Sequence, residues 1–162
     1  MKELLLFLPL SIVFLAIKST LFVSLPLPDL PLIIIFYMGY RRASLEGVLL
    51  SFALGYLDDA FNGSIIGSTS FALVTIFLAV FLLSKKVQFS TPALRAGGVG
   101  AAAIIKGLLS YSVLRFTNVD VYFFTQVILH AVVTGVFASP IIIGLQKLNS
   151  YVSPHTFKDN EN

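Results

Sequence analysis

The sequence has no cysteine, no tryptophan and few charged residues, with Asp, Glu, Lys and Arg making up 12 % of 162 positions. The absence of cysteine excludes a disulfide framework and a cysteine-based zinc site. Soluble domains carry about 25 % charged residues, so this low charge content excludes a water-soluble globule and a disordered chain. The 11 Lys and Arg residues give a net charge of +3 and form no basic stripe, which argues against a nucleic-acid binder.

Hydrophobic residues make up 57 % of the chain, and they gather in apolar segments. A bilayer core about 30 Å thick needs roughly 20 helical residues, and all the segments except the second and third reach that length. Proline, glycine and asparagine separate the segments where turns are expected. The six segments are residues 4–25, 30–40, 44–57, 65–84, 97–116 and 121–145. We therefore predict an all-α polytopic membrane protein with a six-helix transmembrane domain over residues 1–149 and a polar cytoplasmic tail over 150–162.

Basic residues alternate with acidic ones along the predicted loops. Because basic residues mark cytoplasmic loops, this alternation predicts six crossings with both termini in the cytoplasm. The basic residues on the cytoplasmic side are Lys2, Arg41, Arg42, Lys85, Lys86, Arg95, Lys147 and Lys158, and the acidic residues on the outer side are Asp29, Asp58, Asp59 and Asp120. The short second and third segments form two short crossing helices in this interpretation. A re-entrant hairpin would instead leave Arg41 and Arg42 at bilayer depth, which costs roughly 2.5–3.5 kcal/mol each on the insertion scale.

Small residues recur every four positions on the third segment, at Gly47, Ser51 and Gly55, and Asp59 continues the series. Such faces let helix backbones approach closely, which is the usual basis of helix association in lipid. The face therefore indicates either packing inside this helix bundle or docking of another membrane protein.

Several polar residues fall inside predicted spans. Lys106 lies near the middle of the fifth span, and Gln126 and His130 belong to a polar stripe on the sixth. Intramembrane polar residues are candidates for functional sites. A hydrogen-bonded core that fixes helix register, a ligand cavity and a proton relay all fit this pattern.

The neighbouring acids Asp58 and Asp59 lie at the C-terminal end of a predicted helix, where the helix dipole disfavours negative charge. We therefore expect them to be held by amides of the following turn or by a basic group on a partner. Adjacent helical residues point about 100° apart, so a shared catalytic site is not expected. The sequence shows no nucleophile motif, phosphate loop or metal-ligand spacing, and we predict a protein that is not an enzyme and uses no cofactor or metal.

The stretch from Pro28 to Gly67 begins with Pro28-Asp29-Leu30 and continues through the Arg41-Arg42 turn. It then carries the series formed by Gly55, Asp59, Gly63, Ser64 and Gly67. In these features, and most specifically in the last series, the stretch resembles the MreD family of bacterial rod shape-determining membrane proteins. The chain length and the short second and third helices are also similar to that family.

This resemblance implies a non-enzymatic scaffold subunit of the bacterial cell-elongation machinery that makes peptidoglycan. The implied location is the bacterial inner membrane. The implied partners are an MreC-like bitopic protein and, with it, RodA, a class B penicillin-binding protein and MreB. On this basis we hypothesise that the face formed by Gly47, Ser51, Gly55 and Asp59, with Gly63 and Gly67 beyond it, contributes to helix docking. The resemblance also implies a fold like that of the substrate-binding subunits of energy-coupling transporters.

A substrate-binding subunit of an energy-coupling vitamin transporter is the alternative function. Such subunits are also small, six-helical and basic on the cytoplasmic side, and the region of Lys106, Gln126 and His130 would then face the ligand. The first segment has a single alanine, Ala16, and lacks the Ala-x-x-x-Ala docking pattern typical of those subunits.

Overall fold

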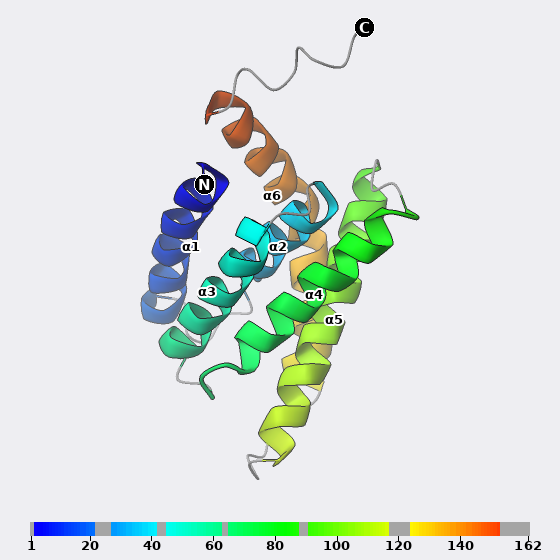
Figure 1. Ribbon diagram of the computed structural model, residues 1–162. Helices are drawn as coiled ribbons and strands as arrows, with labels where there is room; N and C mark the ends of the chain where they lie inside the picture. Colours follow the sequence, from blue (N-terminus) through cyan, green and yellow to red (C-terminus); the bar gives the residue numbers. More distant parts are fainter. Residues whose placement is uncertain are drawn as a thin grey trace, which may run out of the picture.

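The computed structural model describes residues 2–21, 27–41, 45–62, 65–87, 91–116 and 124–152 (Figure 1). Every regular element in these ranges is a helix, so the all-α prediction is confirmed. The helices are α1 (Lys2–Leu21), α2 (Leu30–Arg41), α3 (Leu45–Asn62), α4 (Ser68–Ser84), α5 (Pro92–Phe116) and α6 (His130–Val152), with a short π-helix, η1 (Phe124–Leu129), leading into α6. The predicted tail beyond Val152 lies outside the described residues, as do Arg42 and Gly63.

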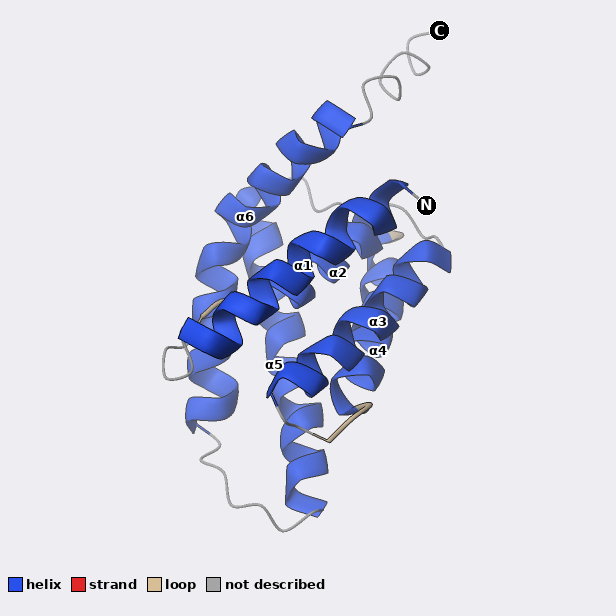
Figure 2. Cartoon of the chain, turned by 90° about the vertical axis from the view of Figure 1, so that its left-hand side faces the viewer, coloured by secondary structure: helices blue, strands red, loops and turns tan. Residues whose placement is uncertain are grey.

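Successive helices run in opposite directions, so their ends gather at two opposite sides of the bundle (Figures 1 and 2). α1, α3 and α5 begin at the side where α2, α4 and α6 end. The side chains of Arg95 near the start of α5 and Gln146 near the end of α6 both contact Tyr40 at the end of α2. The basic residues at these helix ends therefore share one side of the molecule, as the alternation of charges predicts.

The shortest α-helix, α2, lies at the centre of the bundle. It contacts all five other α-helices, and every residue from Pro31 to Gly39 is buried. A helix that is apolar on all sides is stable only when other elements surround it, and α2 carries no charged residue before Arg41. The short second segment is thus shielded by its neighbours.

The outer surface of the bundle is rich in large apolar side chains, whereas several charged and polar side chains are buried. Exposed examples occur on every helix except α2, including Val13, Phe52, Phe71, Leu82, Ile104 and Val136. Asp29, Asp58 and Asp59 are among the buried residues. Charged residues are almost never fully buried unless they are paired, so these acids are expected to have partners inside the bundle.

Among the described residues, two helical segments are long and apolar enough to cross a membrane, Pro92–Ser112 in α5 and Val127–Leu148, which includes most of α6. The apolar helices Phe7–Thr20, Leu30–Arg41 and Ser68–Ser84 are shorter. By length and composition, the structure thus supports two crossings where the sequence analysis predicts six.

The last helix differs most from the prediction: α6 covers His130–Val152 rather than 121–145, follows η1, and extends into the predicted tail. Two further boundaries differ from the prediction for clear local reasons. α5 begins at Pro92 rather than at Gly97, because proline fits the first turn of a helix and the Thr91 hydroxyl accepts a hydrogen bond from the Leu94 N–H at 3.3 Å. α3 continues past Leu57 to Asn62, so that Asp58 and Asp59 lie in its last turns.

Candidate functional site

A buried ion cluster joins three elements of the bundle. The Lys106 ammonium on α5 forms salt bridges with Asp29, which precedes α2, and with Asp58 near the end of α3. The distance from Lys106 Nζ to Asp58 Oδ2 is 2.9 Å. The Lys106 side chain is only 13 % exposed, and both carboxylates are more deeply buried. The sequence analysis singled out Lys106 but found no partner for it, and it counted Asp29 and Asp58 among loop acids.

Asp29 is positioned by its place at the start of α2. Its Oδ1 accepts a hydrogen bond from the Leu32 N–H at 3.2 Å, the usual arrangement of a helix N-cap. Its own N–H donates to Thr134 Oγ1 of α6 at 3.1 Å. One residue thus connects α2, α5 and α6, and the signal that could have revealed it is the acid directly before an apolar helix.

Asp58 occupies the end of α3 that the helix dipole makes unfavourable for a carboxylate. The Lys106 ammonium balances this charge, and Asn62 Nδ2 donates to Asp58 Oδ1 at 2.6 Å. The expected basic group therefore comes from α5 of the same chain and not from a partner protein.

Two further side chains lie within electrostatic range of the cluster. Lys18 of α1 and His130 at the start of α6 both interact with the charge of Asp29. Two carboxylates and one ammonium leave the cluster with one negative charge, and Lys18 supplies a second positive charge nearby. His130 is also within electrostatic range of Lys106, whereas the Gln126 side chain falls outside the described part of the chain.

The second acid of the pair, Asp59, has a different role at the junction between α3 and α4. Its carboxylate accepts hydrogen bonds from the N–H of Gly67 at 2.8 Å and from the N–H of Thr69 at 3.1 Å. These N–H groups belong to the start of α4, which the Ser68 side chain also links to Asp59. Gly67 has a φ of 100°, a left-handed conformation that favours glycine. The amide groups that hold Asp59 therefore belong to α4.

The small-residue face of α3 packs against α4 of the same chain. A Cβ atom added at Gly55 would lie 2.3 Å from the Ser70 Cα, and one at Gly47 would lie 2.4 Å from the Phe77 ring. Ser51 lies between them and donates its hydroxyl hydrogen to the Gly47 carbonyl at 2.6 Å. Because α4 covers this face, it is not open to another protein here, and we correct the hypothesis that it forms a docking surface.

The opposite side of the bundle carries an aromatic and basic cluster. Arg41 donates a hydrogen bond to the Tyr37 hydroxyl, and the Arg95 guanidinium lies 5.9 Å from the centre of the Tyr40 ring. Lys85 and Lys86 follow the end of α4 and are exposed. α2 therefore runs from an acidic group at Asp29 to basic groups at its other end.

The described residues contain no group of three or more His, Asp or Glu side chains that could hold a metal ion. The chemistry available to the cluster is electrostatic: it holds three helices by charge. Comparisons of this chain with protein families, with curated proteins and with solved structures find no match.

Proposed function

We propose that this chain is a multi-pass protein of the bacterial inner membrane, with six crossing helices and both termini in the cytoplasm. The apolar outer surface supports this proposal, because exposed apolar patches of this extent are typical of membrane or protein contact. The buried ion cluster supports it too, since intramembrane charges face the bundle interior and pair with one another. The gathering of basic residues at one side supports the orientation.

The six crossings do not require six long helices. α2 is surrounded by the other helices, and a helix that is shorter than the hydrocarbon thickness is tolerated where neighbours shield its ends or the bilayer thins locally. Asp29 and Asp58, at the outer ends of α2 and α3, would then be held inside the protein by Lys106 rather than exposed to lipid.

We further propose that the protein is a non-enzymatic scaffold subunit of the cell-elongation machinery, which docks an MreC-like bitopic protein and associated synthases. The observation that carries this proposal is that the buried polar groups bind one another within the chain. Lys106, Asp58 and Asp59 bind other parts of the same chain, while the surface offered to neighbours is apolar. Such a molecule acts by presenting a rigid surface to partners in the bilayer. Gly55, Asp59 and Gly67, which carry the resemblance to MreD, all belong to the α3–α4 junction.

The alternative, a substrate-binding subunit of a vitamin transporter, receives less support. Lys106 is engaged with two carboxylates. Among the described residues, an apolar cavity lies between α4 and α5, and neither Lys106 nor His130 lines it. A vitamin with polar groups would need partners that this cavity lacks.

The test is to purify the tagged full chain from native membranes in mild detergent and to identify the accompanying proteins by mass spectrometry. Capture of a bitopic protein with a periplasmic domain is the expected result. ATP-binding-cassette subunits would favour the transporter, and capture of no membrane protein would refute the scaffold role.

Two leucine substitutions test where the docking face lies, and a third serves as the comparison. Gly97 on α5 and Gly144 on α6 have open space where a Cβ would be added, whereas a Cβ added at Gly55 would collide with the α4 backbone. We expect Gly97→Leu or Gly144→Leu to lower partner recovery without disturbing the fold if that glycine lies in the contact. Gly55→Leu serves as the comparison in which recovery falls only because the chain itself is destabilised.

A further inference from the structure

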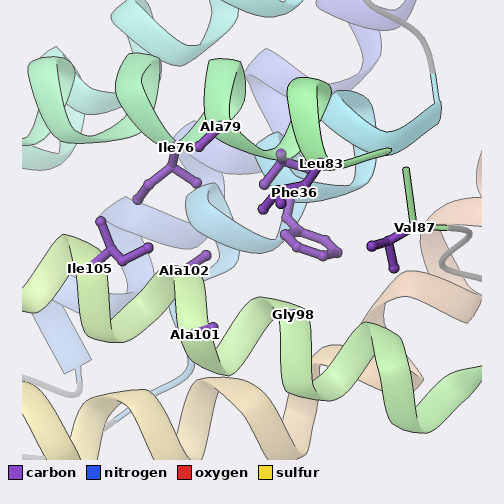
Figure 3. A pocket seen from close by; sticks show the side chains of 10 residues that line it. Phe36, Ile76, Ala79, Leu83, Val87, Gly98, Ala101, Ala102 and Ile105 are labelled. Atoms are coloured by element: carbon purple, nitrogen blue, oxygen red, sulfur yellow. The ribbon is translucent and has the colours of Figure 1, made fainter. Parts of the chain in front are cut away.

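A cavity of about 200 Å³ lies between α4 and α5, with the Phe36 ring of α2 as its floor (Figure 3). Ile76 and Leu83 of α4 form one wall, and Ile105 of α5 belongs to the other. The α5 wall is thin because glycine and alanine occupy positions 98, 101 and 102. The two helices therefore leave a gap that none of the described side chains fills.

This cavity opens to the outside of the bundle and is apolar throughout. Leu83 is 53 % exposed and Ile105 is 45 % exposed, so the walls continue into the outer surface. The atoms that line an empty gap lose dispersion contacts on that side, which makes an unfilled gap unfavourable. Apolar cavities of about 150 Å³ stay dry and bind benzene-sized molecules, so this one has room for an apolar chain segment of comparable or larger size.

Two lysine residues directly precede the residue that lines one end of the cavity. Val87 lines that end (Figure 3), and the exposed residues Lys85 and Lys86 directly precede it. The Lys85 ammonium lies 4.6 Å from the centre of the Phe81 ring, which keeps its side chain along the last turns of α4. The sequence contains no acidic residue between Asp59 and Asp120, so neither α4 nor α5 neutralises this charge.

We propose that the α4–α5 groove binds one acyl chain of an anionic phospholipid, whose phosphate lies at Lys85 and Lys86. The apolar walls select a hydrocarbon chain, and the two ammonium groups select a negative headgroup over a neutral one. A docked protein helix would need no charge at this end, which is why the charge favours a lipid. The inference rests on the membrane embedding proposed above and is independent of the scaffold role.

The test measures lipid binding by native mass spectrometry on the full chain in mild detergent. The probes are palmitoyl-oleoyl phosphatidylglycerol and phosphatidylcholine, which share their acyl chains and differ in charge. Wild type should retain phosphatidylglycerol preferentially, and Lys85→Gln with Lys86→Gln should reduce that retention roughly thirtyfold while leaving phosphatidylcholine unchanged. Lys147→Gln is the matched control, since it removes one charge from the same side of the molecule but lies on α6, which does not line the groove.

Filling the groove with a larger side chain provides a second, independent test. Ala101→Phe places a ring in the cavity at an exposed position, and it should lower the retention of both lipids. Equal retention of the two lipids by wild type would overturn the inference, as would equal losses in Lys147→Gln and the double variant. Loss of a co-purifying protein in Ala101→Phe, with lipid retention unchanged, would assign the groove to a partner helix and overturn it as well. Failure of the chain to sediment with alkaline-washed membranes would refute the embedding itself.

Discussion

Replacing Lys106 with methionine should destabilise the fold by about 3–5 kcal/mol, the range found when one partner of a buried ion pair is removed. Methionine has a side chain similar in length and polarity to the hydrocarbon stem of lysine, but it carries no ammonium group. Asp29 and Asp58 would then be left facing each other, both almost fully buried. Neither carboxylate has another cation in salt-bridge contact among the described residues. The upper part of the range is therefore expected.

The unfolding free energy can be measured by titrating sodium dodecyl sulfate into mild-detergent micelles and following the helical circular dichroism signal. Lys86→Met is the matched control, because the same change at an exposed lysine should stay within about 0.5 kcal/mol of wild type. The triple variant Asp29→Asn, Asp58→Asn, Lys106→Met should recover most of the loss, since it removes all three charges together. A loss below about 1 kcal/mol in Lys106→Met, or no recovery in the triple variant, would refute the idea that the ion cluster holds these helices together.

Three further substitutions test neighbouring contacts by the same unfolding titration. Gly55→Leu should cost about 2–3 kcal/mol, because its Cβ would lie 2.3 Å from the Ser70 Cα; an equal cost for Gly144→Leu, which has open space, would contradict this reasoning. Asp59→Ala should cost about 1–2 kcal/mol by removing the cap of α4, and an unchanged transition would show that water or another group replaces the carboxylate. Thr134→Val should cost about 1–3 kcal/mol by leaving a buried backbone N–H without its acceptor; a neutral result would mean that this N–H finds another partner.

The sequence was informative wherever the signal is local. Apolar runs and turn residues predicted all six α-helices, with boundaries within five residues of the structure for all but the last. The last predicted segment, residues 121–145, begins and ends seven to nine residues before α6 (His130–Val152). The error at the start of α5 came from reading Pro92 as a breaker when it occupies the first helical position. At the end of α3, the drop in hydropathy at Asp58 suggested a boundary, although the helix continues to Asn62 because both acids find partners.

The small-residue series on α3 shows the limit of such signals. Regular spacing of Gly47, Ser51 and Gly55 correctly indicates a face that can approach another helix closely. The same spacing says nothing about which helix arrives there. The answer is α4, because the cap that Asp59 provides fixes the start of α4 beside the end of α3.

Composition and the pattern of apolar segments were enough to determine the helical class, the helix positions and the alternation of charge between the two sides. These properties depend on each segment's own residues and on their period. The partners of Lys106 were decided only by the tertiary structure, since Asp29 and Asp58 lie 77 and 48 positions away along the chain. No local pattern encodes such a meeting, because it depends on how α2, α3 and α5 pack around a common centre. The groove between α4 and α5 likewise depends on the tertiary structure, because it forms where the small residues of α5 face the larger side chains of α4 over the Phe36 ring.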